Sequence, residues 1–216
     1  MSKTAEEVRP RRRTQAQRRA QTRASVLAAA RSVFARRGLS GASLEEIATE
    51  AGVSRGAVYY NFDDKERLFL ALLRERCVER AELLNTLAAD SVEVGAAIRR
   101  VANAFIEASE REPEWTRLFS EFTALAAERP QLRAELAEEL TACRDAIATI
   151  LERRLRDLGV TSKVPKNELA AVVSALANGL ALERAADPTL PRELLARSIE
   201  LIVTGLRTTE HEAGRQ

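Results

Sequence analysis

The sequence predicts an all-α fold in two parts, a small N-terminal unit of three helices and a larger helical C-terminal unit. Strong helix formers dominate the 216 residues, whereas only 9 glycines and 6 prolines interrupt them. Apolar side chains recur at helical spacing, as in the series Val26, Leu27, Ala30, Val33 and Phe34. No stretch shows the alternation typical of strands. With 45% hydrophobic and 31% charged residues, the composition is typical of a soluble globular protein that buries a hydrophobic core.

The charges are distributed unevenly along the chain. Residues 1–37 hold eleven lysines and arginines against two glutamates, which leaves 23 basic and 30 acidic residues for 38–216. A basic end suits a polyanion such as DNA. A solvated tail without a partner accounts for the charge equally well, so both readings stay open.

The cysteine pattern and the hydropathy favour a cytoplasmic protein. Cys77 and Cys143 lie alone in helical patterns, which favours core thiols in a reducing compartment, with a redox sensor as the alternative. No apolar run follows the basic N-terminus, so we expect no signal peptide. The charge-free apolar stretch Leu169–Leu182 has 14 residues and is short for a membrane span.

The N-terminal unit divides into recognisable segments. We expect a disordered basic arm over residues 1–19 and a DNA-binding domain over 20–80. Its first helix continues to about Arg37, where Gly38 ends it. The pattern Ser43-Leu44-Glu45-Glu46 predicts a capping box in which Ser43 and Glu46 each bond the other's amide.

Residues 43–62 have the plan of a helix-turn-helix. Gly52 provides the turn between two short helices, and Ser54 can cap the second of them. The apolar positions suited to the small core between them are Ile47, Ala48, Ala51, Val53 and Val58. The second helix then presents short residues at its N-terminal end, which lets it enter the major groove of DNA. Asp63 and Asp64 are suited to capping a longer helix that reaches about Ala88.

At these residues the chain resembles the TetR family of transcriptional regulators. The resemblance rests on the run Gly52–Leu68, supported by Ala29, Phe34, Gly38 and Ile47-Ala48 upstream, and covers about residues 20–80. It implies a bacterial, dimeric DNA-binding regulator, most often a repressor that a small molecule releases from DNA. Asn61 departs from the family, where many members carry histidine.

The resemblance also implies which residues meet DNA. Arg55 is expected to read a base edge, because its two donors match guanine, and Gly56 allows close approach. Ser43, Tyr59 and Lys65 are expected to contact the DNA backbone and so to position the protein on the duplex. The complete expected set is Ser43, Ser54, Arg55, Gly56, Ala57, Tyr59, Tyr60, Asn61 and Lys65. Two exposed tyrosines beside an arginine-rich arm argue against an ordinary helix pair. Arg9–Arg13 in the arm suit a minor groove or nonspecific neutralisation of phosphates.

The second part, residues 81–216, is expected to bind a ligand and to form the homodimer. Residues 167–186 are apolar nearly all round, which requires burial on both faces. Together with residues 192–208 they predict a two-fold dimer interface, as in TetR-like proteins; a buried central helix in a monomer is the alternative. The scarce aromatic side chains predict an apolar ligand site, although such residues are more often core. They are Phe105, Trp115, Phe119 and Phe122.

Other functions fit the sequence less well. We expect no enzyme and no cofactor or metal, because the chain holds neither a Gly-rich phosphate loop nor a His-Glu-x-x-His motif, and its one histidine is His211. A ligand-independent DNA-binding protein, an activator and an all-helical enzyme that uses carboxylates stay open as alternatives.

Overall fold

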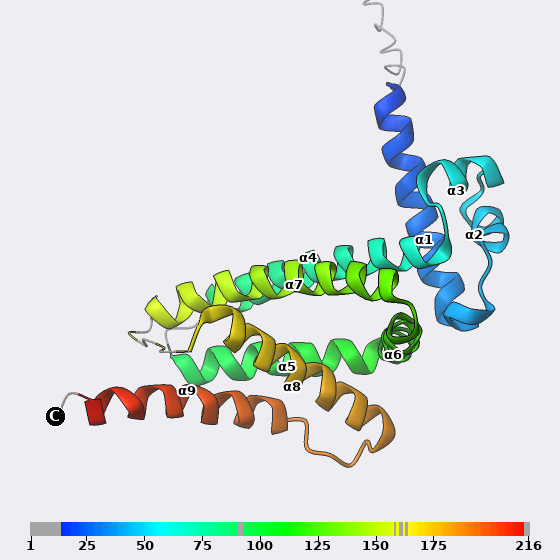
Figure 1. Ribbon diagram of the computed structural model, residues 1–216. Coiled ribbons are helices and arrows are strands. Elements are labelled where there is room, and N and C mark those ends of the chain that lie inside the picture. The colour runs from blue at the N-terminus through cyan, green and yellow to red at the C-terminus, as the bar shows by residue number, and fades with distance from the viewer. Residues whose placement is uncertain (1–13, 90–92, 158, 160–161, 163, 214–216) are drawn as a thin grey trace, which may run out of the picture.

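The computed structural model describes residues 14–89, 93–157, 159, 162 and 164–213. Every regular element in these residues is a helix, which confirms the all-α prediction (Figure 1). In chain order the helices are α1 (Gln15–Gly41), α2 (Leu44–Ala51), α3 (Arg55–Asn61), α4 (Lys65–Ala89), α5 (Val94–Arg111), α6 (Pro113–Glu128), α7 (Pro130–Asp157), α8 (Lys166–Ala186) and α9 (Leu194–Ala213).

Helix α1 begins at Gln15, before the expected domain boundary at residue 20. Thr14 caps it, because its hydroxyl accepts from the Gln17 amide at 3.2 Å and its own amide donates to the Gln17 side chain at 2.9 Å. Residues 15–19 of the expected arm are helical, and Arg9–Arg13 lie outside the described residues. Gly38 breaks the helix as expected, with a left-handed φ of 71°.

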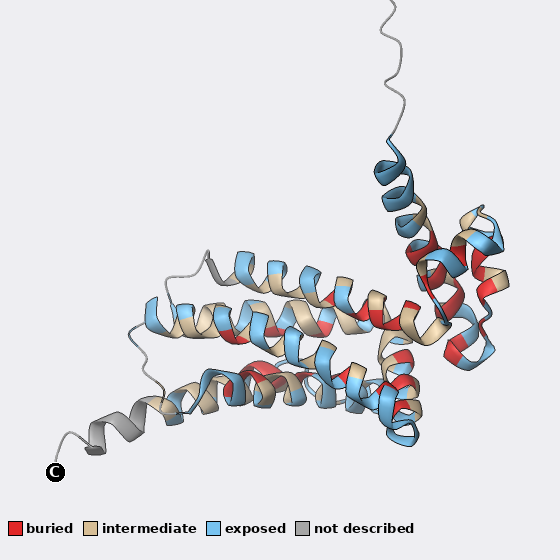
Figure 2. Cartoon of the chain, turned by 45° about the horizontal axis from the view of Figure 1, so that its top comes forward, coloured by how far each residue is buried: buried red, intermediate tan, exposed pale blue. Residues whose placement is uncertain are grey.

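A closed hydrophobic core joins α1–α3 to the start of α4 and to α6 and α7. Phe34, Phe69 and Phe122 are fully buried. Phe69 meets Phe34 edge-on at 6.4 Å between ring centroids and stacks on Phe122 at 4.5 Å. In Figure 2 the buried residues concentrate around α1–α3 and the helix ends that they adjoin. The expected boundary at residue 80 falls inside α4, which continues without a break.

Helices α4 and α7 run side by side and in the same direction (Figure 1). Two contacts that follow one another in the same order along both helices show this direction: Arg74 donates to Glu139 at 3.0 Å, and farther along Arg153 donates to Asn85. Between them a disulfide joins Cys77 to Cys143, whose Cα atoms lie 5.5 Å apart. The expectation of two core thiols is therefore wrong. The sequence could not show the pairing, because it depends on how two helices 66 residues apart align.

A smaller core lies between α5, α8 and α9, where Ile106 and Leu195 are buried. Helices α5 and α9 run antiparallel, with Arg99 bonding Glu200 at 2.7 Å near one end and Arg192 bonding Glu110 near the other. The last helix begins at Leu194, two residues later than expected, because a turn precedes it.

Helix α8 leaves much apolar surface uncovered. Val172 and Leu182 are about half exposed, and Leu201 of α9 is 74% exposed. By length and composition alone α8 is long and apolar enough to cross a membrane. The same exposure is expected of a helix that packs on a partner chain, as predicted for residues 167–186.

Candidate nucleic-acid interface and cavity

The turn between α2 and α3 is formed by Gly52. Its φ of 67° and ψ of 30° are left-handed, and its amide donates to carbonyl oxygens in the last turn of α2. The Val53 amide donates to the Ala48 carbonyl at 3.1 Å, which completes the C-terminal cap. This turn sets the angle between the two short helices, as the helix-turn-helix prediction required.

Serine hydroxyls cap both short helices. Ser43 accepts from the Glu46 amide at 3.1 Å, and Ser54 accepts from the Ala57 amide at 3.2 Å. The reciprocal bond expected from Glu46 to Ser43 does not form. The Glu46 carboxylate turns instead to Arg37, whose Nε lies 3.3 Å away. A charged partner on α1 competes for this carboxylate, since charge-assisted bonds are stronger than neutral ones.

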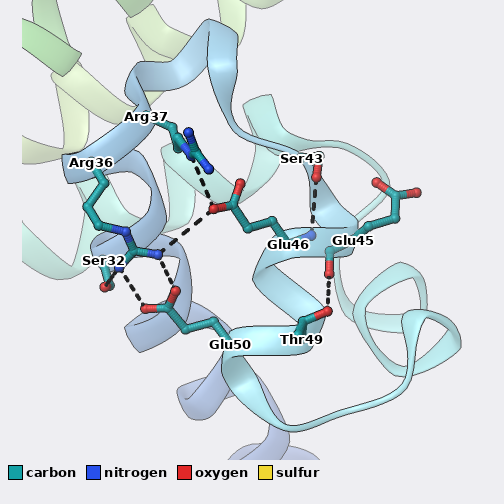
Figure 3. A network of polar contacts seen from close by, with 8 residues as sticks. All are labelled: Ser32, Arg36, Arg37, Ser43, Glu45, Glu46, Thr49 and Glu50. Atoms are coloured by element: carbon teal, nitrogen blue, oxygen red, sulfur yellow. Dashed lines mark hydrogen bonds and ion pairs between the residues drawn. The ribbon is translucent and has the colours of Figure 1, made fainter.

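A polar network fastens α2 to α1 (Figure 3). Arg36 bonds both oxygens of Glu50 in a fork and also donates to Ser32 at 2.6 Å. The bond from Arg36 lowers the pKa of Glu50 to about 2. Figure 3 shows Arg36 and Arg37 on α1 pointing at carboxylates of α2. The helix-turn-helix is therefore held to α1 by charges outside its apolar core.

The residues predicted to meet DNA gather on the outer side of α3. Ser54, Arg55 and Gly56 are exposed at its N-terminal end, and a Cβ added at Gly56 would meet nothing closer than 3.9 Å. Tyr59 is 46% and Tyr60 is 70% exposed. Further expected positions are Ala57, half-buried, and Asn61, whose amide donates to the Ala57 carbonyl at 2.7 Å. Arg19 from α1 lies over the Tyr60 ring at 5.0 Å.

Two of the predicted contact residues already have partners within the chain. Arg55 pairs with Glu45 of α2, and both side chains are exposed. Lys65 donates to the carbonyl oxygens of Ser40 and Ala42 at 3.1 and 3.3 Å. Lys65 therefore also fixes the segment that leads from α1 to α2. Because an ammonium group has three N–H donors, one remains for another acceptor.

A cavity of about 360 Å³ lies within the C-terminal helices. Phe105, Trp115 and Phe119 line it, as predicted for a ligand site. Phe122 does not, because it is fully buried against Phe69; it lies on the same side of α6 as Trp115, whose ring also stacks on Phe69 at 5.4 Å. The predicted ligand contact of Phe122 therefore has no support from this cavity and stays a prediction. Core and cavity positions share one apolar side of α6, so spacing along the helix could not separate them.

The charged residues that line the cavity are arginines: Arg80, Arg144 and Arg154. Arg80 lies over the Phe105 ring at 4.7 Å. Burial, and secondarily the nearby charge of Arg76, lowers the pKa of Arg80 to about 10. Arg80 was not among the residues predicted for the ligand site. Its place in a 4-3-4 spaced stripe with Leu73, Cys77 and Leu84 was the available signal, because such a position faces inward.

Helix α6 connects the cavity to the DNA-binding unit. Trp115 and Phe119 line the cavity, while Glu121 accepts from the Leu39 amide at 2.7 Å. Arg117 donates to the Ala35 carbonyl at 2.8 Å. Two hydrogen bonds therefore tie α6, which borders the cavity, to the C-terminal part of α1. Neither bond could be predicted from local patterns, since each joins residues 82 positions apart.

Both parts of the chain match models of known families. Residues 26–72 match the family described as bacterial regulatory proteins, tetR family, and residues 95–208 match the BetI-type transcriptional repressor, C-terminal. The transcriptional repressor AcnR of Corynebacterium diphtheriae is 31% identical over 165 residues, which is 73% of this chain and 82% of that protein. AcnR of Corynebacterium efficiens is 27% identical over 186 residues, 86% of this chain and 93% of its own. A TetR-family regulator from Rhodococcus sp. superposes with a TM-score of 0.69 at 24% identity, covering 85% of this chain and 99% of that structure.

Proposed function

The chain belongs to the TetR family of transcriptional regulators, and we propose that it is a repressor that binds a near-palindromic operator as a dimer and is released by a small molecule. The observation that carries this proposal is the exposed N-terminal end of α3, held rigidly by the caps and the α1–α2 network. A rigid helix with short side chains at its tip can lie deep in the major groove.

Arg55 is the proposed reader of sequence. Its guanidinium can donate two hydrogen bonds to guanine, but it must first leave Glu45. A site without guanine at that position offers no such pair of acceptors, so less binding energy offsets the loss of the ion pair. Ser43, Tyr59 and the free donor of Lys65 are proposed to contact phosphates, which orients α3 without reading bases. Ser54, Gly56, Ala57, Tyr60 and Asn61 complete the proposed surface.

The dimer is proposed to form through α8 and α9. Their exposed apolar side chains would be covered by the same helices of a second copy, as a two-fold interface requires. This is the use we propose for α8 in place of a membrane span, and it agrees with a protein that works on DNA in the cytoplasm. The α3 helices of the two copies would then lie about 34–36 Å apart, which is one turn of DNA.

Release is proposed to follow from the cavity. A ligand that binds better to a form with a different spacing of the two α3 helices shifts the population toward that form. The hydrogen bonds from Glu121 and Arg117 to α1 supply the connection. The matched BetI-type repressor model over 95–208 supports repression, and the regulators among the relatives support a non-enzymatic role.

Titration against labelled DNA from upstream of the protein's own gene, with scrambled DNA alongside at two salt concentrations, tests the proposal. We expect about 10³-fold tighter binding to the specific site. Arg55→Ala should relax the sequence preference, whereas Lys65→Ala should weaken binding to all DNA alike. A reporter behind the same promoter should rise when the gene is deleted; a fall indicates an activator.

If promoter and scrambled DNA bind equally, the operator lies elsewhere, and a selection from random DNA is used to find it. If that selection also yields no preferred sequence at low salt, the DNA-binding proposal is wrong. Because Lys65 also holds Ser40 and Ala42, its variant is compared with Tyr59→Phe, which removes one hydroxyl and leaves the fold contacts in place.

A further inference from the structure

The cavity carries charge of one sign. Its lining contains the three arginines named above and, among the residues the structure describes, no aspartate or glutamate. The rest of the wall is almost entirely apolar, with leucine, isoleucine, valine, alanine and aromatic side chains from several helices. Such a wall favours a hydrocarbon body, and its electrostatic potential repels cations.

Among these arginines of the described residues, Arg80 has neither an ion pair nor a hydrogen bond. Within the described residues no carboxylate lies in ion-pair distance of its guanidinium, whose recorded neighbour is the Phe105 ring. The nearest acid that influences it, Glu112, is already bonded to Arg76. Of the other two, Arg154 pairs with the carboxylate of Asp157 at 3.5 Å, and Arg144 donates to the neutral hydroxyl of Thr141 at 3.0 Å.

A partly desolvated cation without a counter-charge is unfavourable, so an anion that reaches Arg80 gains more than it would at an exposed arginine. A planar carboxylate matches the guanidinium fork with two parallel bonds. On α8, which also lines the cavity, the buried hydroxyl of Ser174 has no hydrogen-bond partner and can donate to a further oxygen.

We propose that the effector is an amphipathic carboxylate, whose anionic head bonds Arg80 and whose apolar body fills the cavity beside Phe105 and Trp115. This inference rests on the proposed function, since it names the ligand class of that same regulator. The volume of about 360 Å³ lies near the lower end of the range for ligand sites, roughly 300–1,000 Å³, so a compact body is expected.

The test uses three probes of equal chain length: decanoate, 1-decanol and decylamine, each below the concentration at which it forms micelles. Binding to the full-length protein is followed by calorimetry and by the fluorescence of Trp115, the chain's single tryptophan, which lines the cavity. Decanoate should bind at least ~10-fold more tightly than decanol, because a charge-assisted bond is added to the same apolar contact. Decylamine should bind most weakly.

Variants of Arg80 test whether this side chain causes the preference for decanoate. Arg80→Gln should weaken decanoate binding by ~10-fold or more and leave decanol unchanged, and Arg80→Lys should fall between them. Arg111→Gln is the matched control, because Arg111 is exposed on α5 and lies outside the cavity lining. If Arg80→Gln does not fold, the three-probe series on the unaltered protein still decides.

Decanol binding as tight as decanoate, equal losses for both in Arg80→Gln, or no binding of any probe overturns the inference. A DNA titration separates this outcome from the proposed function. Specific DNA binding with no preference for the carboxylate rejects the ligand class alone. Preference for decanoate without sequence-specific DNA binding supports the ligand class and contradicts the proposed regulator.

Discussion

The DNA-binding unit and the cavity-bearing helices are both built from α-helices, but they differ in how completely their apolar side chains are packed. In the first, Val26, Val33, Phe34, Ile47 and Val58 have no exposed surface, and caps and ion pairs fasten the helix ends. In the second, the helices surround a hollow with a poorly compensated arginine, and α8 and α9 expose apolar side chains.

The difference teaches where each part obtains its stability. The DNA-binding unit is closed by its own residues, which preserves the shape that must fit a groove. The cavity-bearing part leaves surface for a ligand inside and for a second chain outside, so its stability depends on what it binds. Regions that must change state are drawn from the less stable parts of a protein.

Aromatic truncation gives the largest expected contrast. Phe34→Ala should lower the free energy of unfolding by about 3–5 kcal/mol, because it leaves a cavity in a closed core. Phe105→Ala should cost clearly less, because that ring already borders empty space. Denaturant unfolding of both variants measures the two losses. Equal losses would show that the cavity wall is packed as tightly as the core.

Reduction of the disulfide is expected to have the next largest effect. The bond closes a loop of 66 residues between α4 and α7, so breaking it should lower stability by roughly 2–4 kcal/mol. Unfolding is compared with and without reductant, and Cys77→Ser, which cannot form the bond, should not respond to reductant. A wild-type protein that is equally stable in both conditions contradicts the prediction.

Acid should affect the DNA-binding unit through Glu50. Its pKa is lowered to about 2 in the folded protein, so its contribution is complete above the ordinary glutamate value of about 4.5 and is lost as pH falls toward 2. Between these values the melting temperature should fall more steeply for the wild type than for Glu50→Gln. The effect is the smallest of the three, because the pair with Arg36 is exposed. Parallel curves for the two proteins would assign the acid sensitivity to other groups.

Local signals allowed much of the fold and of the DNA-binding surface to be predicted. Ser43, Ser54, Gly38 and Gly52 act on their immediate neighbours, and their caps and turns lie where the sequence placed them. The positions of the proposed DNA contacts followed from the family resemblance and lie together on α3 and beside it.

Contacts between distant helices could not be predicted in the same way. The Cys77–Cys143 bond, the pairing of Glu46 with Arg37 and the separation of Phe122 from the cavity depend on how helices are rotated against each other. A single sequence specifies which face of a helix is apolar, but not which neighbour that face meets. The partners already held by Arg55 and Lys65 were missed for the same reason.

Helix α4 has a consequence for the construction of chimeric regulators. Its 25 residues span about 37 Å, and they place Phe69 in the closed core and Arg80 at the cavity. No flexible joint therefore separates the two parts, and a fusion must be made within a continuous helix. One inserted residue would turn the DNA-binding unit by about 100° relative to the rest and shift it by 1.5 Å. Grafts that keep the residue count of α4 should preserve the rotation of the DNA-binding unit about the axis of this helix. An exchange of domains that changes the count by one or two residues would not.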